Sequence, residues 1–400
     1  MKKYSELLTT AVASIMALSM LAGCGGETAA VSTDSGATAT ESSAEGAKFN
    51  IGAIGPLTGG AAAYGMAVCN AAELAVEEIN ANGGINGYQV VYNKEDDELN
   101  AEKSVNAYNT LKDKGMQILV GSTTSACSIA VSEYTKADNM FQLTPSGSAE
   151  DCVKYDNVFR VCFSDPNQGI ASAQYISDHK LATKVGIIYD SSDVYSSGIY
   201  QKFTEESAGK SYEIVSAEAF TQDNNTDFSV QLQKAKDAGA DLVFLPIYYK
   251  DASLILTQAN TMGYKPTFFG VDGLDGILTV ENFDTSLAEG VMLLTPFAAD
   301  AKDDLTVNFV SKYQEKYGEI PNQFAADAYD AVYIIKQGIE AKNITPDMSV
   351  SDICEQLKSA MTEIEASGLT SAKMTWAASG EPNKEPKAVV IQNGAYVSAQ

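Results

Sequence analysis

The sequence predicts an α/β protein with two doubly wound lobes, each a mainly parallel sheet covered by helices. Short apolar runs alternate with amphipathic helical segments from residue 49 to residue 297, as in parallel strands joined by crossover helices. The alternation pauses at Asp165-Pro166 and restarts, which divides it into two units of similar size. The length of 400 residues also exceeds one domain of about 150 residues.

The first unit opens with an apolar strand at residues 49–54. A loop, Gly55-Pro56-Leu57-Thr58-Gly59, leads to a helix whose small and apolar residues recur at helical spacing until Ile79. Asn82-Gly83-Gly84 ends this helix. The further strands of the unit are predicted at 88–92, 117–120 and 141–144, and the further helices at 101–112 and 126–136.

The second unit repeats the pattern. It is predicted to contain helices at 169–179, 195–208, 228–238 and 252–262, and strands at 184–189, 212–215, 242–247, 267–271 and 290–297. Three more helices are predicted at 305–317, 325–342 and 350–361, before a strand-like tail at 372–397. Two α/β lobes leave a cleft between them, where ligands commonly bind.

The N-terminal residues 1–23 are predicted to be an export signal. Two lysines precede an apolar stretch at residues 7–21, which is too short for a spanning helix of about 20 apolar residues. The run Leu21-Ala22-Gly23-Cys24 resembles a bacterial lipoprotein box, in which the cysteine, here Cys24, is lipidated; an ordinary signal with a coincidental cysteine is the alternative. Residues 24–47 are predicted to form a flexible tether. We therefore expect an exported protein, lipid-anchored to the outer face of the cytoplasmic membrane or periplasmic.

The composition excludes several classes of function. The chain holds 52 acidic and 27 basic residues, a net charge of −25, so we expect no nucleic acid partner and membrane contact only through the lipid anchor. His179 is the only histidine, which excludes a metal site built from several imidazoles. Arg160 is the only arginine, which excludes an Arg cluster for phosphate or carboxylate. Since no nucleophile has a plausible base beside it, we expect a binding protein without cofactor, metal or enzymatic activity.

Five cysteines follow the predicted signal: Cys69, Cys127, Cys152, Cys162 and Cys354. An exported compartment permits disulfides, but the number is odd and the spacing matches no zinc site. Buried free thiols and a single bridge both stay open. Cys152 with Cys162 is the favoured pair if a bridge forms, because these residues flank a turn-and-strand segment.

Hydroxyl-rich loops follow two neighbouring strands of the first unit. They read Gly121-Ser122-Thr123-Thr124-Ser125 and Pro145-Ser146-Gly147-Ser148. Hydroxyls and free backbone N–H groups at a helix N-terminus bind an anion without a cationic side chain. Ordinary helix capping is the alternative for either loop alone. Two such loops on adjacent strands favour a carboxylate site.

Acids and tyrosines stand at the strand ends of the second unit. The strands end at Asp190, at Tyr248-Tyr249 and at Asp272-Gly273, and Tyr195 follows Asp190 by five residues. An acid at a strand end in a cleft can pair with a ligand cation, although a helix cap or solvated turn is the alternative for Asp272. An anion-binding lobe that faces an acid-and-tyrosine lobe suits a zwitterion.

From Phe49 to Val397 the chain resembles the bacterial branched-chain amino acid binding proteins, which are type I periplasmic binding proteins that feed ABC importers. The most specific stretches are Ile54-Gly55-Pro56-Leu57-Thr58-Gly59, Gly83-Gly84-Ile85-Asn86-Gly87, Tyr189-Asp190 with Tyr195, Phe269-Gly270-Val271-Asp272-Gly273, and the tail from Met374-Thr375-Trp376 to Gly380-Glu381-Pro382. The resemblance implies a monomer whose two lobes are joined by a hinge, close around a ligand and dock on a transporter permease.

The resemblance also implies the site residues. Ser125 corresponds to the serine that holds the ligand carboxylate. Gly147 and Ser148 fall where the family contacts ligand through a backbone group and a hydroxyl, although many members have Ala-Thr there. Asp272 falls where many members place an acid against the ligand ammonium. The resemblance places three tyrosines in the cleft: Tyr64 along the ligand side chain, Tyr195 and Tyr248.

The sequence therefore predicts a lipid-anchored solute-binding protein that captures an amino acid, branched-chain or otherwise small and apolar, and delivers it to an ABC importer. Lobe 1 is expected at 48–165 plus 297–365, and lobe 2 at 166–296 plus 366–400. The alternatives are an extracellular ligand-sensing domain, and a binder of an amide, urea or aromatic acid.

Overall fold

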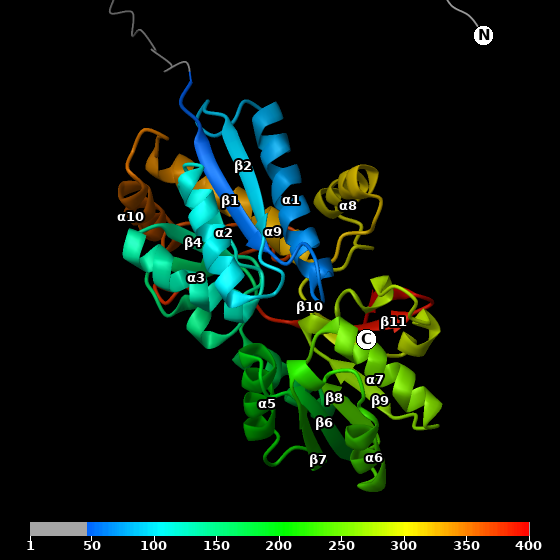
Figure 1. The fold of residues 1–400 in the computed structure, drawn as a ribbon. Coiled ribbons are helices and arrows are strands. Elements are labelled where there is room, and N and C mark those ends of the chain that lie inside the picture. Colours follow the sequence, from blue (N-terminus) through cyan, green and yellow to red (C-terminus); the bar gives the residue numbers. More distant parts are fainter. Residues whose placement is uncertain (1–45, 400) are drawn as a thin grey trace, which may run out of the picture. The chain divides into compact units, whose positions relative to one another are not determined.

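The computed structural model of the protein describes residues 46–399. The predicted signal at 1–23, the lipidation site Cys24 and nearly all of the predicted tether lie outside these residues. The first sheet is parallel throughout and has the strand order β2-β1-β3-β4-β5 (Figure 1). Its strands are β1 (Phe49–Gly55), β2 (Val90–Asp96), β3 (Ile118–Val120), β4 (Phe141–Thr144) and β5 (Val158–Arg160).

The second sheet has seven strands in the order β12-β11-β10-β9-β8-β6-β7. Five of them are parallel, and the last two along the chain, β11 and β12, pair antiparallel at one edge. The strands are β6 (Lys184–Asp190), β7 (Glu213–Phe220), β8 (Leu242–Leu245), β9 (Thr267–Gly270), β10 (Met292–Thr295), β11 (Lys387–Gln392) and β12 (Ala395–Ser398).

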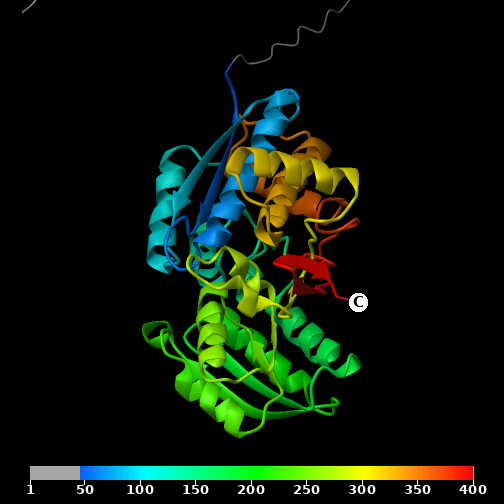
Figure 2. The same cartoon turned by 90° about the vertical axis from the view of Figure 1, so that its right-hand side faces the viewer.

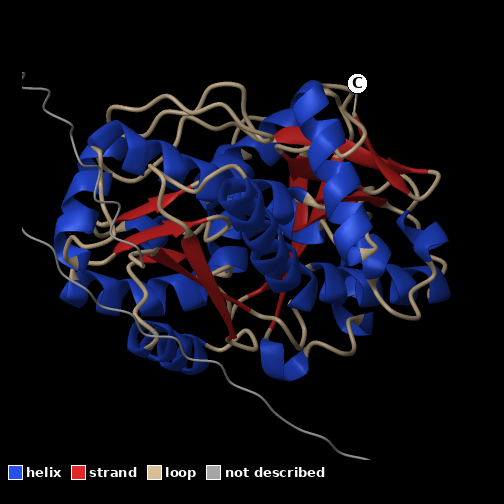
Figure 3. Cartoon of the chain, turned by 90° about the horizontal axis from the view of Figure 1, so that it is seen from above, coloured by secondary structure: helices blue, strands red, loops and turns tan. Residues whose placement is uncertain are grey.

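Helices pack on both faces of the sheets (Figure 3). The helices associated with the first sheet are α1 (Ala62–Ala81), α2 (Ala101–Asp113), α3 (Ser125–Asp138), α8 (Asp304–Tyr317), α9 (Gln323–Lys342) and α10 (Val350–Met361). Those associated with the second are α4 (Asp165–Asp178), α5 (Val194–Glu206), α6 (Ser229–Asp237) and α7 (Tyr249–Thr261). Within residues 46–399, no helix combines the length and apolar character that crossing a membrane requires.

The predicted α/β fold with two parallel-sheet lobes is confirmed, and three details add to the prediction or differ from it. The short strand β5 lies between Cys152 and Cys162, where the sequence indicates a turn-and-strand segment without bounds. The turn after β9 contains short 3-10 helices, of which η3 (Asp272–Leu274) is the first. The tail at 372–397 was predicted to be strand-like, but regular strands begin only at Lys387. Residues 372–386 instead form the connection between the two sheets.

The chain passes between the two sheets three times, after β5, after β10 and after α10. Figure 2 shows α8 to α10, coloured yellow to orange, on the same half of residues 46–399 as the blue strands of the first sheet. The third passage is held by Lys384, whose buried ammonium pairs with Asp327 of α9 and donates to Thr370 Oγ1 at 2.7 Å. Asp330 of α9 accepts from the backbone of the same segment.

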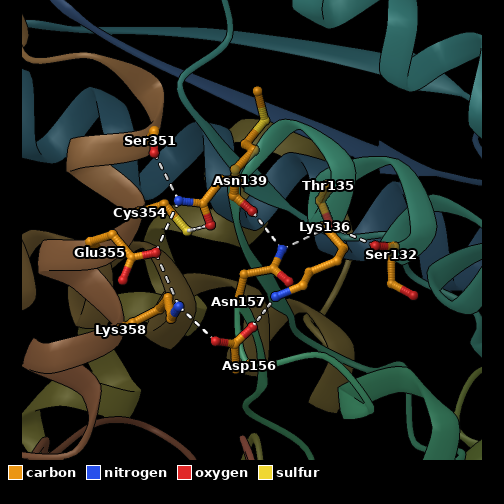
Figure 4. Close-up of polar contacts among 11 residues, drawn as sticks. Ser132, Thr135, Lys136, Asn139, Asp156, Asn157, Ser351, Cys354, Glu355 and Lys358 are labelled. Carbon is orange, nitrogen blue, oxygen red and sulfur yellow. Dashed lines mark hydrogen bonds and ion pairs between the residues drawn. The ribbon is translucent and has the colours of Figure 1, made fainter.

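Polar contacts fix α10 to the first sheet (Figure 4). Asn139 ends α3 in the left-handed conformation, with φ of 47°. Its side-chain amide donates to Ser351 Oγ at 2.8 Å and to Glu355 Oε1 at 2.9 Å. Asp156, just before β5, accepts from Lys136 of α3 and Lys358 of α10. The lobe therefore includes a helix that lies some 200 residues further along the chain.

Candidate functional site

The two sheets present matching strand ends to one pocket. Five strands of each sheet share the same order, β2-β1-β3-β4-β5 in the first and β7-β6-β8-β9-β10 in the second. In such sheets, ligands bind beyond the carboxyl ends of the strands, where the strand order reverses. Loops at these ends surround a small pocket. Its lining residues are Tyr64, Thr123, Thr124, Ser125, Ser146, Tyr195, Tyr248, Asp272, Gly273 and Phe324.

One side of the pocket, the hydroxyl wall, consists of Thr123, Thr124, Ser125 and Ser146 from the loops after β3 and β4. Because α3 begins at Ser125, the N–H groups of its first turn have no acceptor within the helix. The positive end of the helix dipole lies at the same place. The Thr124 hydroxyl is buried and has no hydrogen-bond partner among residues 46–399. The wall therefore offers several donors without any formal charge.

Ser125 is the donor whose geometry is most constrained. Its Oγ accepts from the backbone N–H groups of Ser148 at 3.2 Å and Ala149 at 3.1 Å. A hydroxyl has two lone pairs and one hydrogen, so these two bonds occupy both lone pairs. The hydrogen is left to donate to a molecule in the pocket. This arrangement fits the carboxylate-binding role predicted for Ser125.

Gly147 and Ser148, which the resemblance places against the ligand, lie behind Ser125 and do not line the pocket. Their carbonyl oxygens accept from the buried guanidinium of Arg160. The Ser148 hydroxyl is buried without a partner in the described chain. It lies near Asp165, whose pKa is raised well above its usual range by burial, an effect that the Ser148 hydroxyl opposes. Direct ligand contact by Gly147 and Ser148 stays a prediction.

The opposite side of the pocket, the acidic wall, consists of Tyr195, Tyr248, Asp272 and Gly273 from the second sheet. Asp272 is 3% exposed, and its Oδ1 accepts from the Tyr195 hydroxyl at 2.6 Å. Burial raises the pKa of Asp272 to about 6, while hydrogen bonds from Tyr195 and Gln168 act to lower it. No basic side chain lines the pocket. A buried carboxylate without a basic partner favours a cationic group beside it.

Aromatic rings close the remaining side of the pocket. The ring of Tyr64 packs against Phe324 with centroids 4.5 Å apart, Tyr249 at 4.9 Å and Tyr248 at 5.4 Å. Tyr195 stacks on Tyr248 at 5.0 Å. These rings give a ligand side chain apolar surroundings.

Two sets of hydrogen bonds join the elements of the two sheets beside the pocket. The Tyr64 hydroxyl donates to Gly273 O and accepts from Tyr249 N at 3.2 Å, so its hydrogen-bonding capacity is largely used. The backbone N–H of Gln323, at the start of α9, donates to Asp275 Oδ2 at 3.0 Å. The Gln323 side chain also donates to Asp272 O at 3.3 Å. Both sets flank the acidic wall.

Of the predicted site residues, Tyr64, Ser125, Tyr195, Tyr248 and Asp272 meet at the pocket, although they are spread over some 200 positions. No sequence pattern singles out Thr124 or Phe324. Thr124 belongs to the hydroxyl-rich loop, and its unpaired hydroxyl is visible only in the structure. Phe324 lies in the first turn of a helix that the chain reaches after a full second lobe, and no local pattern marks it.

The five cysteines of the described chain are free and buried, and Cys152 and Cys162 form no bridge. Burial raises the pKa of Cys69, Cys127 and Cys152 to about 12, so these thiols stay protonated and unreactive. No group of three or more metal-ligating side chains comes together within residues 46–399. His179 is exposed at the end of α4 and stacks on Tyr175.

Known proteins with similar sequences are binding proteins, which agrees with the geometry of the pocket. Residues 48–394 match the sequence profile of a family described as periplasmic binding protein. The Leu/Ile/Val-binding protein homolog 3 of Brucella melitensis is 31% identical over 315 residues, which cover 78% of this chain and 84% of that protein.

Solved structures of similar fold contain small acids. The substrate binding protein LivJ of a branched-chain amino acid transporter from Streptococcus pneumoniae, in complex with isoleucine, is 27% identical, with a TM-score of 0.80 over 88% of this chain and 99% of that one. A solute binding protein of an ABC transporter from R. palustris, in complex with benzoate, is 18% identical, with a TM-score of 0.76 over 88% of this chain and 95% of that one. The second likeness is one of fold alone.

Proposed function

Because this chain belongs to the periplasmic binding protein family, in the branch of the branched-chain amino acid binding proteins, we propose that it captures an α-amino acid with a small apolar side chain for an ABC importer. The family is one of binding proteins without enzymatic activity. The ligand occupies the pocket between the hydroxyl wall and the acidic wall.

The opposition of these two walls carries the proposal. The hydroxyl wall offers neutral donors at the start of α3, and the acidic wall offers the buried carboxylate of Asp272. An α-amino acid carries a carboxylate and an ammonium on one carbon, so it pairs with both walls at once. An acid without the amine leaves Asp272 buried and unpaired, and a neutral amide gives neither wall an opposite charge.

The rings support the choice of an apolar side chain. Tyr64 and Phe324 line the pocket, and the Tyr64 hydroxyl is engaged by Gly273 and Tyr249. A polar side chain would lose its hydrogen bonds to water against these rings.

Calorimetry tests this proposal. We expect leucine, isoleucine or valine to bind one to one, and we expect two matched analogues of leucine to bind at least about tenfold more weakly. One is 4-methylpentanoic acid, which lacks the ammonium, and the other is leucinol, which lacks the carboxylate. Tight binding of the acid or of a neutral amide, with no amino acid bound, would place the protein in another branch of the family.

Hinge closure is part of the proposal. We propose that lobe 1 comprises residues 48–165 and 297–365, that lobe 2 comprises 166–296 and 366–400, and that a ligand bridging both favours the closed form by its greater affinity for that form. Small-angle scattering should show a smaller radius of gyration when the best amino acid is added. An unchanged radius at saturation contradicts closure.

We further propose that Cys24 carries a lipid anchor and that residues 1–23 are removed. Its support is the lipoprotein-box sequence. A diacylglyceryl group supplies two chains, which stable anchoring requires. Cys24→Ser should release the protein from the membrane fraction or leave it unprocessed. Wild-type protein found wholly in the soluble fraction and free of lipid would refute the anchor.

A further inference from the structure

Arg160 is the only arginine of the chain, and its side chain is fully buried at the end of β5. Its Nη1 donates to the carbonyl oxygens of Gly147, at 3.2 Å, and Ser148. Its Nη2 donates to Ala149 O at 3.0 Å and to Glu150 O at 3.4 Å. One guanidinium therefore binds four consecutive carbonyl oxygens, from Gly147 to Glu150. A buried cation needs such partners, because removing it from water is costly.

Two peptide units of this loop connect Arg160 to Ser125. In the first unit, the Gly147 carbonyl accepts from Arg160 and the Ser148 N–H donates to Ser125 Oγ. In the second, the Ser148 carbonyl accepts from Arg160 and the Ala149 N–H donates to the same Oγ. The C=O and N–H of a trans peptide point in opposite directions across a rigid plane. Because each carbonyl oxygen points toward Arg160, the N–H group of the same peptide unit points toward Ser125 Oγ.

We infer that Arg160 is the positioning residue of the hydroxyl wall and strengthens its hold on a ligand carboxylate through these two peptide units and Ser125, without touching the ligand. The inference rests on the proposed function. The charge of Arg160 polarises both peptide units, their N–H groups occupy the lone pairs of Ser125 Oγ, and the serine hydrogen is left for the pocket. Hydrogen bonds linked in this sense strengthen one another.

The same guanidinium is tied to the third passage between the sheets. Arg160 Nη2 donates to Glu381 Oε1 at 2.9 Å, its backbone N–H donates to Gly380 O at 3.1 Å, and its carbonyl accepts from Trp376 Nε1 at 2.8 Å. The Glu381 contact holds the guanidinium itself, and the other two hold the backbone of Arg160. Lysine has a single ammonium on a flexible stem and cannot reproduce the fork that holds adjacent carbonyls.

The test compares two ligands rather than one affinity. Leucine and leucinol differ in the carboxylate, so the dissociation constant of leucinol divided by that of leucine reports carboxylate recognition alone. Arg160→Lys should reduce this ratio by roughly tenfold, the effect of a weakened charge-assisted hydrogen bond. The matched control is Lys384→Met, which breaks another buried ion pair of the same passage. It should lower the melting temperature and leave the ratio unchanged.

A double-mutant cycle tests whether Arg160 acts on the ligand through Ser125. In a Ser125→Ala background, Arg160→Lys should change the ratio by less than about threefold, because the two residues act in series. Equal effects of Arg160→Lys in both backgrounds overturn the inference. An equal loss of leucine and leucinol affinity also overturns it, because Arg160 would then be merely structural. Should Arg160→Lys fail to fold, Glu381→Ala keeps the cation, releases one of its partners, and should lower the ratio by a smaller factor.

Hydrogen exchange of the ligand-free protein separates this inference from the proposed function. Peptides that cover residues 147–150 should exchange faster in Arg160→Lys or Glu381→Ala than in wild type, and those from α6 should be unchanged. If wild type binds none of leucine, isoleucine and valine, the proposed function fails, and the exchange result alone decides whether Arg160 orients the loop. Unchanged exchange at 147–150 overturns the inference.

Discussion

The hydroxyl wall and the acidic wall are built at equivalent strand ends of sheets with the same strand order, yet they present different groups to the pocket. The hydroxyl wall presents neutral donors, with the nearest cation, Arg160, one layer behind. The acidic wall presents a full charge, Asp272, in direct contact with the pocket. The same topology therefore positions two kinds of site, and the residues after the strands decide which kind forms.

This difference between the walls shows where the protein keeps a buried charge without an opposite charge beside it. Behind the hydroxyl wall, the buried cation Arg160 is already paired with backbone carbonyls and Glu381, so a ligand carboxylate meets only neutral donors. On the acidic wall the protein keeps a buried carboxylate, and burial raises its pKa to about 6. The ligand ammonium relieves this cost, so we expect the acidic wall to dominate affinity.

The largest expected effect is the loss of Asp272. Asp272→Ala removes one partner of a buried charge pair, which costs about 2–5 kcal/mol, or roughly 30-fold to several-thousand-fold in affinity. Melting of the ligand-free protein should change far less, because the carboxylate is costly there. Calorimetry with leucine measures the effect. An unchanged affinity would reverse the order we assign to the two walls.

The hydroxyl wall should respond to Ser125→Ala with a smaller loss. A hydrogen bond to a charged group contributes about 1.5–3 kcal/mol, or roughly tenfold to a hundredfold in affinity. Ser132→Ala is a suitable control, because Ser132 is buried in the same helix and does not line the pocket. A Ser125 effect larger than that of Asp272 would show that the neutral wall is the stronger one.

The pH dependence separates the walls further. The pKa of Asp272 is about 6 here, and a bound ammonium lowers it. A carboxyl whose pKa is lower in the complex loses affinity as pH falls through the pKa of the free protein. Leucine affinity should therefore be constant above pH 7 and about tenfold lower one unit below the free pKa. The Asp272→Asn variant should lose this dependence; if it persists, another acid such as Asp275 is responsible.

The smallest effect is expected where the two walls meet. Tyr64→Phe removes the hydroxyl that bonds to Gly273 O and Tyr249 N, at a cost of about 1 kcal/mol, or roughly fivefold in affinity. The pH dependence should stay as in wild type, since Asp272 is retained. Calorimetry at two pH values measures both. A loss comparable to that of Asp272→Ala would mean that the walls cannot be treated separately.

The fold and much of the site could be predicted because they depend on local patterns. Alternating strands and helices indicate parallel sheets, and parallel sheets place their loops at one edge, so Tyr195, Tyr248 and Asp272 were accessible from strand ends alone. Tyr64 required the family resemblance. Phe324 comes from a helix after the second lobe and joins the pocket through packing against Tyr64, which local periodicity does not encode.

The role of Arg160 could not be predicted from the sequence, for a different reason. A single arginine correctly excludes a cluster around a carboxylate. It does not reveal that this cation faces the carbonyls of Gly147 and Ser148 while their peptide N–H groups face Ser125. Side-chain identity predicts chemistry at a position, but the direction of a peptide plane is a property of the folded loop.

The contacts of Tyr64 with Gly273 and of Gln323 with Asp275 give the pocket a kinetic property. Under the proposed closure, a bound ligand leaves only after both contacts have broken, so its shortest residence time is set by the opening rate of the protein. Ligands that differ in affinity then share a similar slow step in dissociation. A transporter that separates Gln323 from Asp275 accelerates release of every ligand alike, and it does so without recognising the side chain that the pocket selected.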